Sequence, residues 1–185
     1  MIHSLYFDST AYDYAYELER LIRNFSLPHK LDFYTGKSPS GTDYAYFTAD
    51  GGRLSVTVSD SGKTVTARTN IYTDDAETQL CRLLCRCMEK LGHAPLPRGI
   101  LTGVRPVKYI RNIYETRDNA DDYIHGTLLV SDKKLKLAND VIRLQKPILD
   151  TLTLNRISLY ISIPFCPSRC SYCTFVSASG ERELK

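Results

Sequence analysis

Leu159-Tyr-Ile-Ser-Ile-Pro-Phe-Cys166-Pro-Ser-Arg-Cys170-Ser-Tyr-Cys173-Thr-Phe175 is the stretch of this chain that bears most directly on its fold. It joins a short β-branched and aromatic run to three cysteines in the spacing Cys-x3-Cys-x2-Cys. Three clustered thiolates can bind three irons of a [4Fe-4S] cluster, whereas a self-contained ferredoxin site uses four. The remaining iron would then be free to bind a substrate or a cofactor.

A zinc site and a set of disulfides are the alternatives for this loop. Structural zinc uses four protein ligands, usually as two close pairs, and no fourth Cys or His lies near the three cysteines. Disulfide pairing would leave one of the three cysteines over, and nothing else suggests secretion. Ligand count and spacing therefore favour the cluster, with zinc and incidental thiols as the competing interpretations.

Composition limits the possible architectures and partners. A chain of 185 residues that is 43% hydrophobic can bury one good core, with room for a small appendage. The net charge of +3 comes from interspersed acids and bases, which argues against a nucleic-acid partner. No apolar run of about 18 residues is present, so we expect no membrane partner either. The acidic start argues against a secretory signal, and we expect a cytoplasmic protein.

Residues 1–97 are predicted to form an α+β domain. The alternation of apolar and polar residues indicates an antiparallel meander with one wet face. A first helix would begin at the cap Thr10, carry an apolar stripe through Leu18 and Ile22, and end before Pro28. The predicted strands are 1–7, 31–34, 44–48, 54–59 and 64–72. No glycine-rich phosphate loop opens a helix, so nucleotide binding of the Rossmann or P-loop kind is unsupported.

A second helix of this domain contains three further cysteines. Asp74 and Glu77 resemble a capping box, and Gly92 marks the helix end. One-turn spacing could suggest a second metal site. Free cysteine also behaves as a small hydrophobe, so we expect these thiols to belong to the core. The three are Cys81, Cys85 and Cys87.

Residues 98–155 are predicted to be a helical connector. A helix starting at Pro106 presents three cations near its positive end, namely Arg105, Lys108 and Arg111. They could meet an anionic partner, or form a solvated face in which Arg111 pairs with Glu115. Both interpretations stay open. Further helices are expected over 119–129 and 131–144, with Pro147 ending or kinking the last one.

Residues 156–185 complete the predicted organisation. A strand over 156–163 would deliver the cysteine loop at its carboxyl end, where α/β barrels and open α/β sheets place their chemistry. The sequence therefore predicts an α+β protein: an antiparallel meander packed with helices, a helical connector, and a strand that leads into the cysteine loop.

Two segments carry a family resemblance. Tyr160-Ile-Ser-Ile-Pro-Phe-Cys166-x3-Cys170-x-Tyr172-Cys173-x-Phe175 resembles the first barrel strand and cluster loop of radical S-adenosylmethionine (SAM) enzymes, specifically the oxygen-independent coproporphyrinogen III oxidases. Leu101-Thr-Gly-Val-Arg-Pro-Val-Lys108 resembles the segment that marks coproporphyrinogen dehydrogenases of the HemZ type. The resemblance covers roughly residues 98–178, and the N-terminal part is similar only in kind.

The resemblance implies roles for single residues. Tyr160 and Tyr172 fall where family members contact SAM. Phe165 and Phe175 would shield the cluster from water, although ordinary packing explains apolar rings equally well. The implied ligands of the [4Fe-4S] cluster are Cys166, Cys170 and Cys173.

The resemblance also implies an activity. Family members use the reduced cluster and SAM to remove hydrogen from the propionates of a porphyrinogen, which lose carbon dioxide and become vinyl groups, as in the protoporphyrinogen IX step of haem biosynthesis. Such an enzyme also needs an electron donor, which the sequence does not identify. Because only the start of a barrel is visible, we expect the chain to be a truncated fragment that is inactive alone. The alternatives are a related haem chaperone or methyltransferase, and an iron-free interaction module that docks a partner through residues 1–150.

Overall fold

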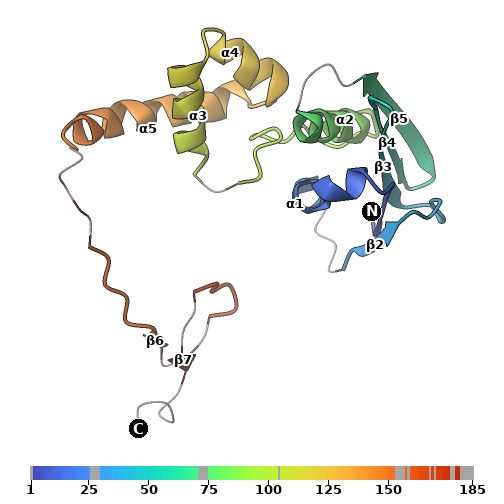
Figure 1. The fold of residues 1–185 in the computed structure, drawn as a ribbon, viewed down its shortest axis with the longest axis horizontal. Coiled ribbons are helices and arrows are strands. Elements are labelled where there is room, and N and C mark those ends of the chain that lie inside the picture. The colour runs from blue at the N-terminus through green and yellow to red at the C-terminus, as the bar shows by residue number, and fades with distance from the viewer. Residues whose placement is uncertain are drawn as a thin grey trace. The chain divides into compact units, whose positions relative to one another are not determined.

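The fold is that of a computed structural model, which describes residues 2–25, 30–70, 75–103, 105–152, 157, 159–166, 168, 170–175 and 178–179. The chain divides into two compact units, Met1–Lys146 and Pro147–Lys185. The first holds a sheet with its helices and a further group of helices, and the second holds the cysteine loop (Figure 1). The domain boundaries expected after residues 97 and 155 stay predictions.

A five-stranded mixed sheet organises the first unit, in the order β2-β1-β3-β4-β5. Strands β3, β4 and β5 form the predicted antiparallel meander. The expectation that the segment 31–34 belongs to this meander is wrong, because β2 pairs in parallel with β1, and β1 also runs parallel to β3. The strands are β1 (Ser4–Phe7), β2 (Asp32–Thr35), β3 (Tyr44–Asp50), β4 (Arg53–Asp60) and β5 (Lys63–Asn70).

The parallel pairing follows from the connection between β1 and β2. A hairpin turn reverses the chain, but the helix α1 (Ala15–Phe25) lies between these strands and provides a crossover that returns the chain to the same end of the sheet. Side chains alternate between the two faces in parallel and antiparallel strands alike. The alternation in the sequence therefore located the strands without giving their direction.

One face of the sheet forms the main core with α1 and with α2 (Ala76–Lys90), which lie on the same side (Figure 1). Each large apolar side chain buried here contributes roughly 1.5–3 kcal/mol relative to an exposed one. The opposite face carries polar residues, which confirms the predicted wet face. The fully buried strand residues include Leu5, Phe7, Ala45, Phe47, Leu54, Val56 and Val58.

The start of the first helix differs from the prediction. Thr10 has helical backbone angles and makes no side-chain cap. Asp8 caps the chain instead, because its Oδ1 accepts a hydrogen bond of 2.6 Å from the backbone N–H of Ala11. A single 3₁₀ turn, Ala11–Tyr14, then precedes α1. Thr10 and Asp8 are both good cap residues, so residue type alone could not separate them.

Helix α2 begins one residue later than expected. Its cap is Asp75, which accepts a hydrogen bond of 3.1 Å from the backbone N–H of Thr78. Asp74 lies outside the described residues. The predicted end is confirmed, since Gly92 follows the helix with φ of +96°.

A second buried cluster lies among the helices that follow. The segment 119–129 is not the plain helix that was predicted: a three-residue helix leads into a π-helical turn, closed by the N–H of Leu128 on the carbonyl of Tyr123 at 3.0 Å. Pro147 does not end the last helix, which continues to Asp150. The elements are α3 (Pro106–Thr116), α4 (Ala120–Asp122), the π turn η2 (Tyr123–Thr127) and α5 (Asp132–Asp150).

Polar contacts join this helical group to the sheet domain. The guanidinium of Arg20 donates to the carbonyl of Thr102 at 2.7 Å, and the Thr102 hydroxyl donates to Glu17 at 2.9 Å. The N–H of Ile100 donates to the carbonyl of Leu128 at 3.0 Å. The first two bonds connect α1 to the residues that precede α3, and the third connects those residues to the end of the π turn.

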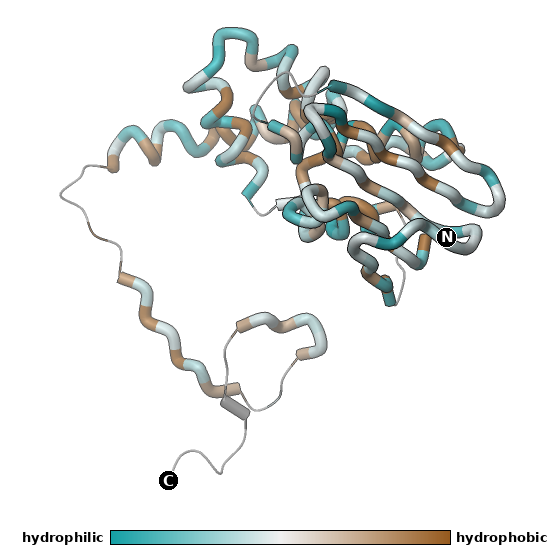
Figure 2. The backbone as a smooth tube through the Cα atoms, turned by 45° about the vertical axis from the view of Figure 1, so that its right-hand side comes forward, coloured by the Kyte–Doolittle hydropathy of each residue, from teal (hydrophilic) through white to brown (hydrophobic). Residues whose placement is uncertain are grey.

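The strand predicted over 156–163 is not formed by the described residues of that segment, residue 157 and residues 159–163. Their apolar side chains are exposed, and Figure 2 shows them as alternating brown positions along an extended trace. A strand needs the backbone of a neighbouring strand as its hydrogen-bonding partner, and none lies beside these residues in the described structure. Two short strands follow, β6 (Phe165–Cys166) and β7 (Ala178–Ser179), paired in parallel.

Candidate functional site

The cysteine loop begins on β6 and is closed by the pairing of β6 with β7. Phe165 lies opposite Ala178, and Cys166 lies opposite Ser179. Between the two strands the chain makes a tight turn, in which the backbone N–H of Cys173 donates to the carbonyl of Cys170 at 3.0 Å. The turn holds the backbones of Cys170 and Cys173 together. The pairing of β6 with β7 positions the start of the loop, at Cys166.

The thiols of this loop are accessible and unpaired. Cys166 and Cys170 are exposed, Cys173 is half-buried, and none forms a disulfide. The structure does not gather three such side chains into one metal-binding group anywhere in the described part of the chain. The donor set fits a [4Fe-4S] cluster, because three thiolates are available to iron on a short loop. The loop as described would have to close around the metal.

The aromatic residues of the motif also face solvent. The side chains of Tyr160 and Tyr172 are 81% and 85% exposed. Phe165 is 47% exposed and Phe175 is 74% exposed, so neither ring covers the cysteines in this arrangement. The predicted SAM contacts and the predicted shielding role stay predictions, because both need a loop that has closed.

The cationic residues at the start of α3 line a separate hollow of about 440 Å³. Arg105 adopts a left-handed conformation with φ of +62°, which is uncommon for a residue with a Cβ. Arg111 lies 3.6 Å from Glu115, and its Nε forms no hydrogen bond with the residues described. The predicted ion pair is therefore present but long, while Arg105 and Lys108 have no acidic partner in the described structure.

The three cysteines of α2 belong to the core, as expected. Cys81, Cys85 and Cys87 are buried, and the thiol of Cys87 lies 3.5 Å from the carbonyl oxygen of Val56. Burial penalises the thiolate and raises the pKa of Cys85 to about 12 and that of Cys87 to about 11. The pKa of Cys81 is raised for the same reason. Neutral, buried thiols are poor metal ligands.

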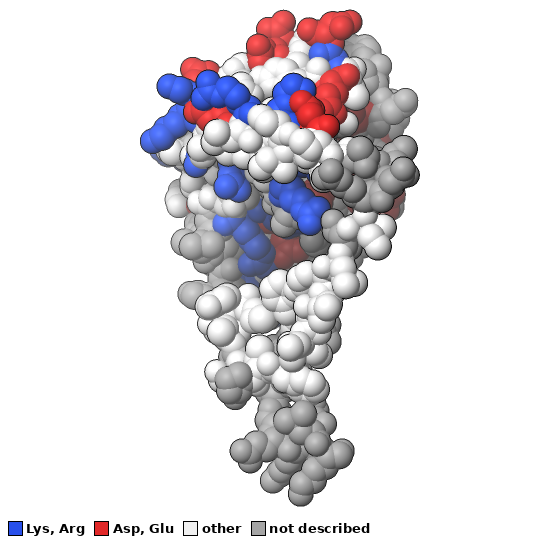
Figure 3. All heavy atoms as spheres, turned by 90° about the vertical axis from the view of Figure 1, so that its left-hand side faces the viewer, with Lys and Arg blue, Asp and Glu red and all other residues white. Residues whose placement is uncertain are grey.

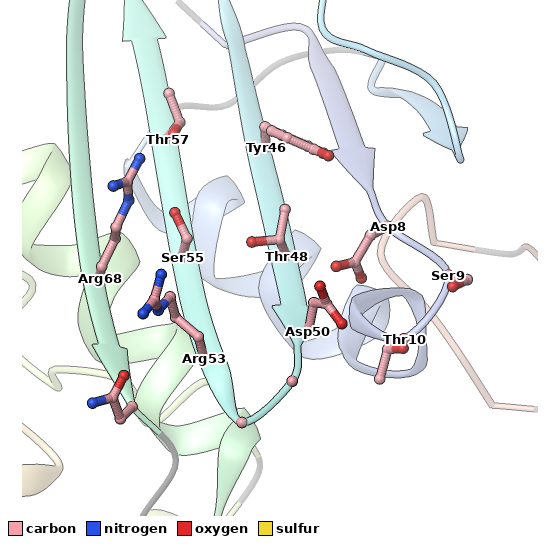
Figure 4. Close-up of a pocket in the computed structure, with 13 residues that line it drawn as sticks. Asp8, Ser9, Thr10, Tyr46, Thr48, Asp50, Arg53, Ser55, Thr57 and Arg68 are labelled. Atoms are coloured by element: carbon pink, nitrogen blue, oxygen red, sulfur yellow. The ribbon is translucent and has the colours of Figure 1, made fainter.

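A polar hollow on the open face of the sheet was not predicted. It is lined by residues from the β1–η1 loop and from β3, β4 and β5, among them Arg53 and Arg68 (Figure 4). The sequence did contain a sign of it, because hydroxyl-bearing residues and both arginines recur at every second position, on the solvent-facing side of the strands. The strand order that brings them together could not be deduced from that period.

Charge over the rest of the first unit is mixed. Figure 3 shows Lys and Arg side chains among Asp and Glu side chains at the end that carries α4. Among the described residues, no helix has the length and apolar character needed to cross a membrane.

The comparisons with known proteins identify one relevant similarity. No protein-family model and no solved structure matches the chain. A stretch of 82 residues is 34% identical to the oxygen-independent coproporphyrinogen-III oxidase-like protein HemZ of Bacillus subtilis (strain 168). The match covers 42% of this chain and 16% of that protein, so the chain spans a small part of its relative's length. The chain is therefore similar to part of an oxygen-independent coproporphyrinogen-III oxidase-like protein.

Proposed function

We propose that this chain provides the cluster-binding segment of a radical SAM enzyme related to the oxygen-independent coproporphyrinogen III oxidases. The observation that carries the proposal is the loop of three accessible, unpaired thiols at Cys166, Cys170 and Cys173. The similarity to a coproporphyrinogen-III oxidase-like protein supports the same assignment. The substrate would be a porphyrinogen, and the pathway would be haem biosynthesis.

The three cysteines would hold a [4Fe-4S] cluster as thiolates. The backbone turn between Cys170 and Cys173 is already formed, and closing the loop would bring the three thiols together. Metal binding of this kind supplies free energy for ordering a loop that is open without metal. The cluster and SAM together supply the one-electron chemistry that removes hydrogen from a propionate side chain.

Other residues would orient the cofactor and the substrate. Tyr160 and Tyr172 would contact SAM once the loop closes, because both rings and hydroxyls are free to turn toward it. Arg105 and Lys108 would bind propionates, since cations without an acidic partner suit carboxylates. Residues 156–185 would form the first strand and loop of the barrel, in which the exposed apolar residues of 157–165 would be covered by neighbouring strands. An electron donor, still unidentified, would complete the reaction.

Anaerobic reconstitution tests the proposal on this chain. After incubation with iron and sulfide, we expect about four iron and four sulfide per chain and an electron paramagnetic resonance signal after reduction. In a protein that carries this segment together with a complete barrel, the signal should change on addition of SAM. Replacing Cys166, Cys170 or Cys173 with serine should abolish the signal. Ser168→Ala, a change in the same loop without loss of sulfur, should leave it unchanged.

The outcomes separate the alternatives. In a protein that carries the complete barrel, a reduced cluster signal that is indifferent to SAM would contradict the radical SAM assignment. Tight haem binding by that protein without oxidation of coproporphyrinogen would favour the chaperone alternative. Absence of iron after reconstitution, with an unaltered circular dichroism spectrum, would favour an iron-free interaction module.

A further inference from the structure

The open face of the sheet carries a hollow of about 1090 Å³ that no part of the proposed function uses. Its walls are the β1–η1 loop, the turn between β3 and β4, and the end of β5, and its floor is formed by side chains of β3 and β4 (Figure 4). It contains no residue of the cysteine loop and none of the α3 cations. The hollow is large enough for a small organic ligand.

Two arginines line one side of this hollow. Arg68 lies opposite Ser55, and Arg53 lies opposite Asn70, so the two arginines are diagonal neighbours on the same face of β4 and β5. Figure 4 shows both guanidinium groups between these strands. Neither group forms a hydrogen bond or an ion pair with another residue that the structure describes. Two neighbouring positive charges with ten N–H donors favour an anion that can bridge them.

Hydroxyl groups extend this donor set across the sheet. Ser55 lies opposite Arg68 on one side and opposite Thr48 on the other, so the three residues form a row across β5, β4 and β3. Thr48 and Ser55 are half-buried, and their hydroxyls bond to no other residue in the described ranges. A ligand oxygen above this row could accept hydrogen bonds from the guanidinium and from the hydroxyls.

Two acidic residues also line the hollow. Asp50 ends β3 opposite Arg53, and Figure 4 shows its carboxylate on the side of β3 that faces Asp8. Both oxygens of Asp8 already accept backbone hydrogen bonds, from Ala11 at 2.6 Å and from Ala49 at 2.7 Å. Asp50 is exposed and forms no ion pair within the part of the chain that is described. Its carboxylate is therefore available to accept hydrogen bonds from O–H or N–H groups of a ligand. The hollow thus offers donors on one side and an acceptor on the other.

An aromatic ring completes the floor. Tyr46 is half-buried, lies opposite Thr57, and its hydroxyl bonds to no residue of the described structure. A partly exposed ring presents a flat apolar surface on which a planar group can stack. The hollow therefore has partners for an anion, for hydroxyl groups and for a planar group, and a nucleotide contains all three.

We propose that this hollow binds a nucleoside monophosphate or a ligand of the same chemistry. Arg53 and Arg68 hold the phosphate, Ser55, Thr48 and Asp50 bond to the ribose, and the base lies against Tyr46. A phosphate monoester suits two guanidinium groups better than a carboxylate, because it carries nearly two negative charges and three terminal oxygens. The site uses neither a glycine-rich loop nor a helix N-terminus, so it is compatible with the absence of Rossmann and P-loop motifs.

Isothermal titration of the chain with adenosine 5′-monophosphate (AMP) and with adenosine tests the proposal. We expect saturable AMP binding that is at least about tenfold tighter than adenosine binding, because adenosine lacks the phosphate. Arg68→Gln and Arg53→Gln should each weaken AMP binding by about tenfold or more. Lys63→Gln is the matched control, because Lys63 is exposed on the same strand as Arg68 and lies outside the hollow. This substitution also removes one positive charge.

Three results would overturn the proposal: equal binding of AMP and adenosine, equal losses from Arg68→Gln and Lys63→Gln, or no saturable AMP binding at millimolar concentration. Tyr46→Leu should weaken AMP binding but leave the affinity for inorganic phosphate unchanged, and an equal loss for both would exclude stacking. Cys166→Ser should bind AMP normally. The result is thereby independent of whether the loop assembles a cluster.

Discussion

The six cysteines fall into two groups that differ in their chemistry. The thiols of Cys81, Cys85 and Cys87 are buried side chains of α2, and burial raises their pKa values. The loop thiols are accessible. Since the thiolate is the reactive form of cysteine, a reagent that modifies thiolates should react with the two groups at different rates, without any mutation.

Alkylation with iodoacetamide at pH 8 should modify the loop cysteines quickly and the α2 cysteines only after unfolding, because the α2 thiols are both buried and neutral. Peptide mass spectrometry after a short exposure to iodoacetamide measures the extent of alkylation at each cysteine. Reconstitution with iron and sulfide should then protect only Cys166, Cys170 and Cys173. Rapid native labelling of Cys85 would contradict its position in the core.

Stability should fall in mildly alkaline solution. In the unfolded chain these thiols ionise with a pKa of about 8.5, whereas the raised pKa values keep Cys85 and Cys87 protonated in the folded chain up to about 11. Above about pH 8.5 the unfolded state therefore binds fewer protons, and the free energy of unfolding decreases as pH rises. Urea denaturation between pH 7 and 10 measures the slope, which should be smaller in Cys85→Ala than in the parent chain.

Gly99 is a residue whose side chain is excluded by its surroundings. Its φ is +56°, and a Cβ would overlap the carbonyl oxygen of Leu128 and lie 2.5 Å from the carbonyl group of Leu129. Gly99→Ala should therefore cost about 3 kcal/mol, measured by urea denaturation, because both the backbone and the contact are incompatible with a methyl group. Gly103→Ala, where nothing lies within 4 Å, should change stability by no more than about 0.5 kcal/mol.

At the level of secondary structure, Asp8 joins two elements that are distant in sequence. One carboxylate oxygen caps the turn that precedes α1, and the other accepts from the N–H of Ala49 on β3 at 2.7 Å. Asp8→Ala should cost about 2 kcal/mol, since it leaves two backbone donors without an acceptor. Asp13→Ala, an exposed acid of the adjoining turn, is the control for thermal denaturation. Equal losses of stability in Asp8→Ala and Asp13→Ala would show that the two hydrogen bonds of Asp8 do not stabilise the fold.

The sequence predicted these elements to different degrees. The strands of the meander and the apolar stripe of α2 were readable because each repeats with the period of its own secondary structure. The parallel pairing of β1 was not, since it depends on contacts between distant segments. The π turn after Asp122 was not predicted either, because it is a single turn that interrupts the helical period. The motif of Cys166, Cys170 and Cys173 was visible as spacing, whereas the hollow at Arg53 and Arg68 required the strand order.

For the molecule as a whole, both buried clusters lie in the first unit, Met1–Lys146. A chain ending at Asp150, where α5 ends, should therefore keep the urea midpoint and the far-ultraviolet circular dichroism of the structured part. Limited proteolysis of the full chain should cut first within 157–165, whose apolar side chains are exposed. A lowered midpoint in the shortened chain would show that residues beyond Asp150 support the core.

The position of β1 has a consequence for synthesis on the ribosome. This strand is an interior strand of the sheet, between β2 and β3, and Ser4 pairs with both Asp32 and Tyr44. Because β1 leaves the exit tunnel before β2 and β3, it must wait for these two later strands before its backbone groups are satisfied on both sides. During that interval Leu5 and Phe7 remain available to chaperones, and translation speed through β2 and β3 sets how long they stay uncovered.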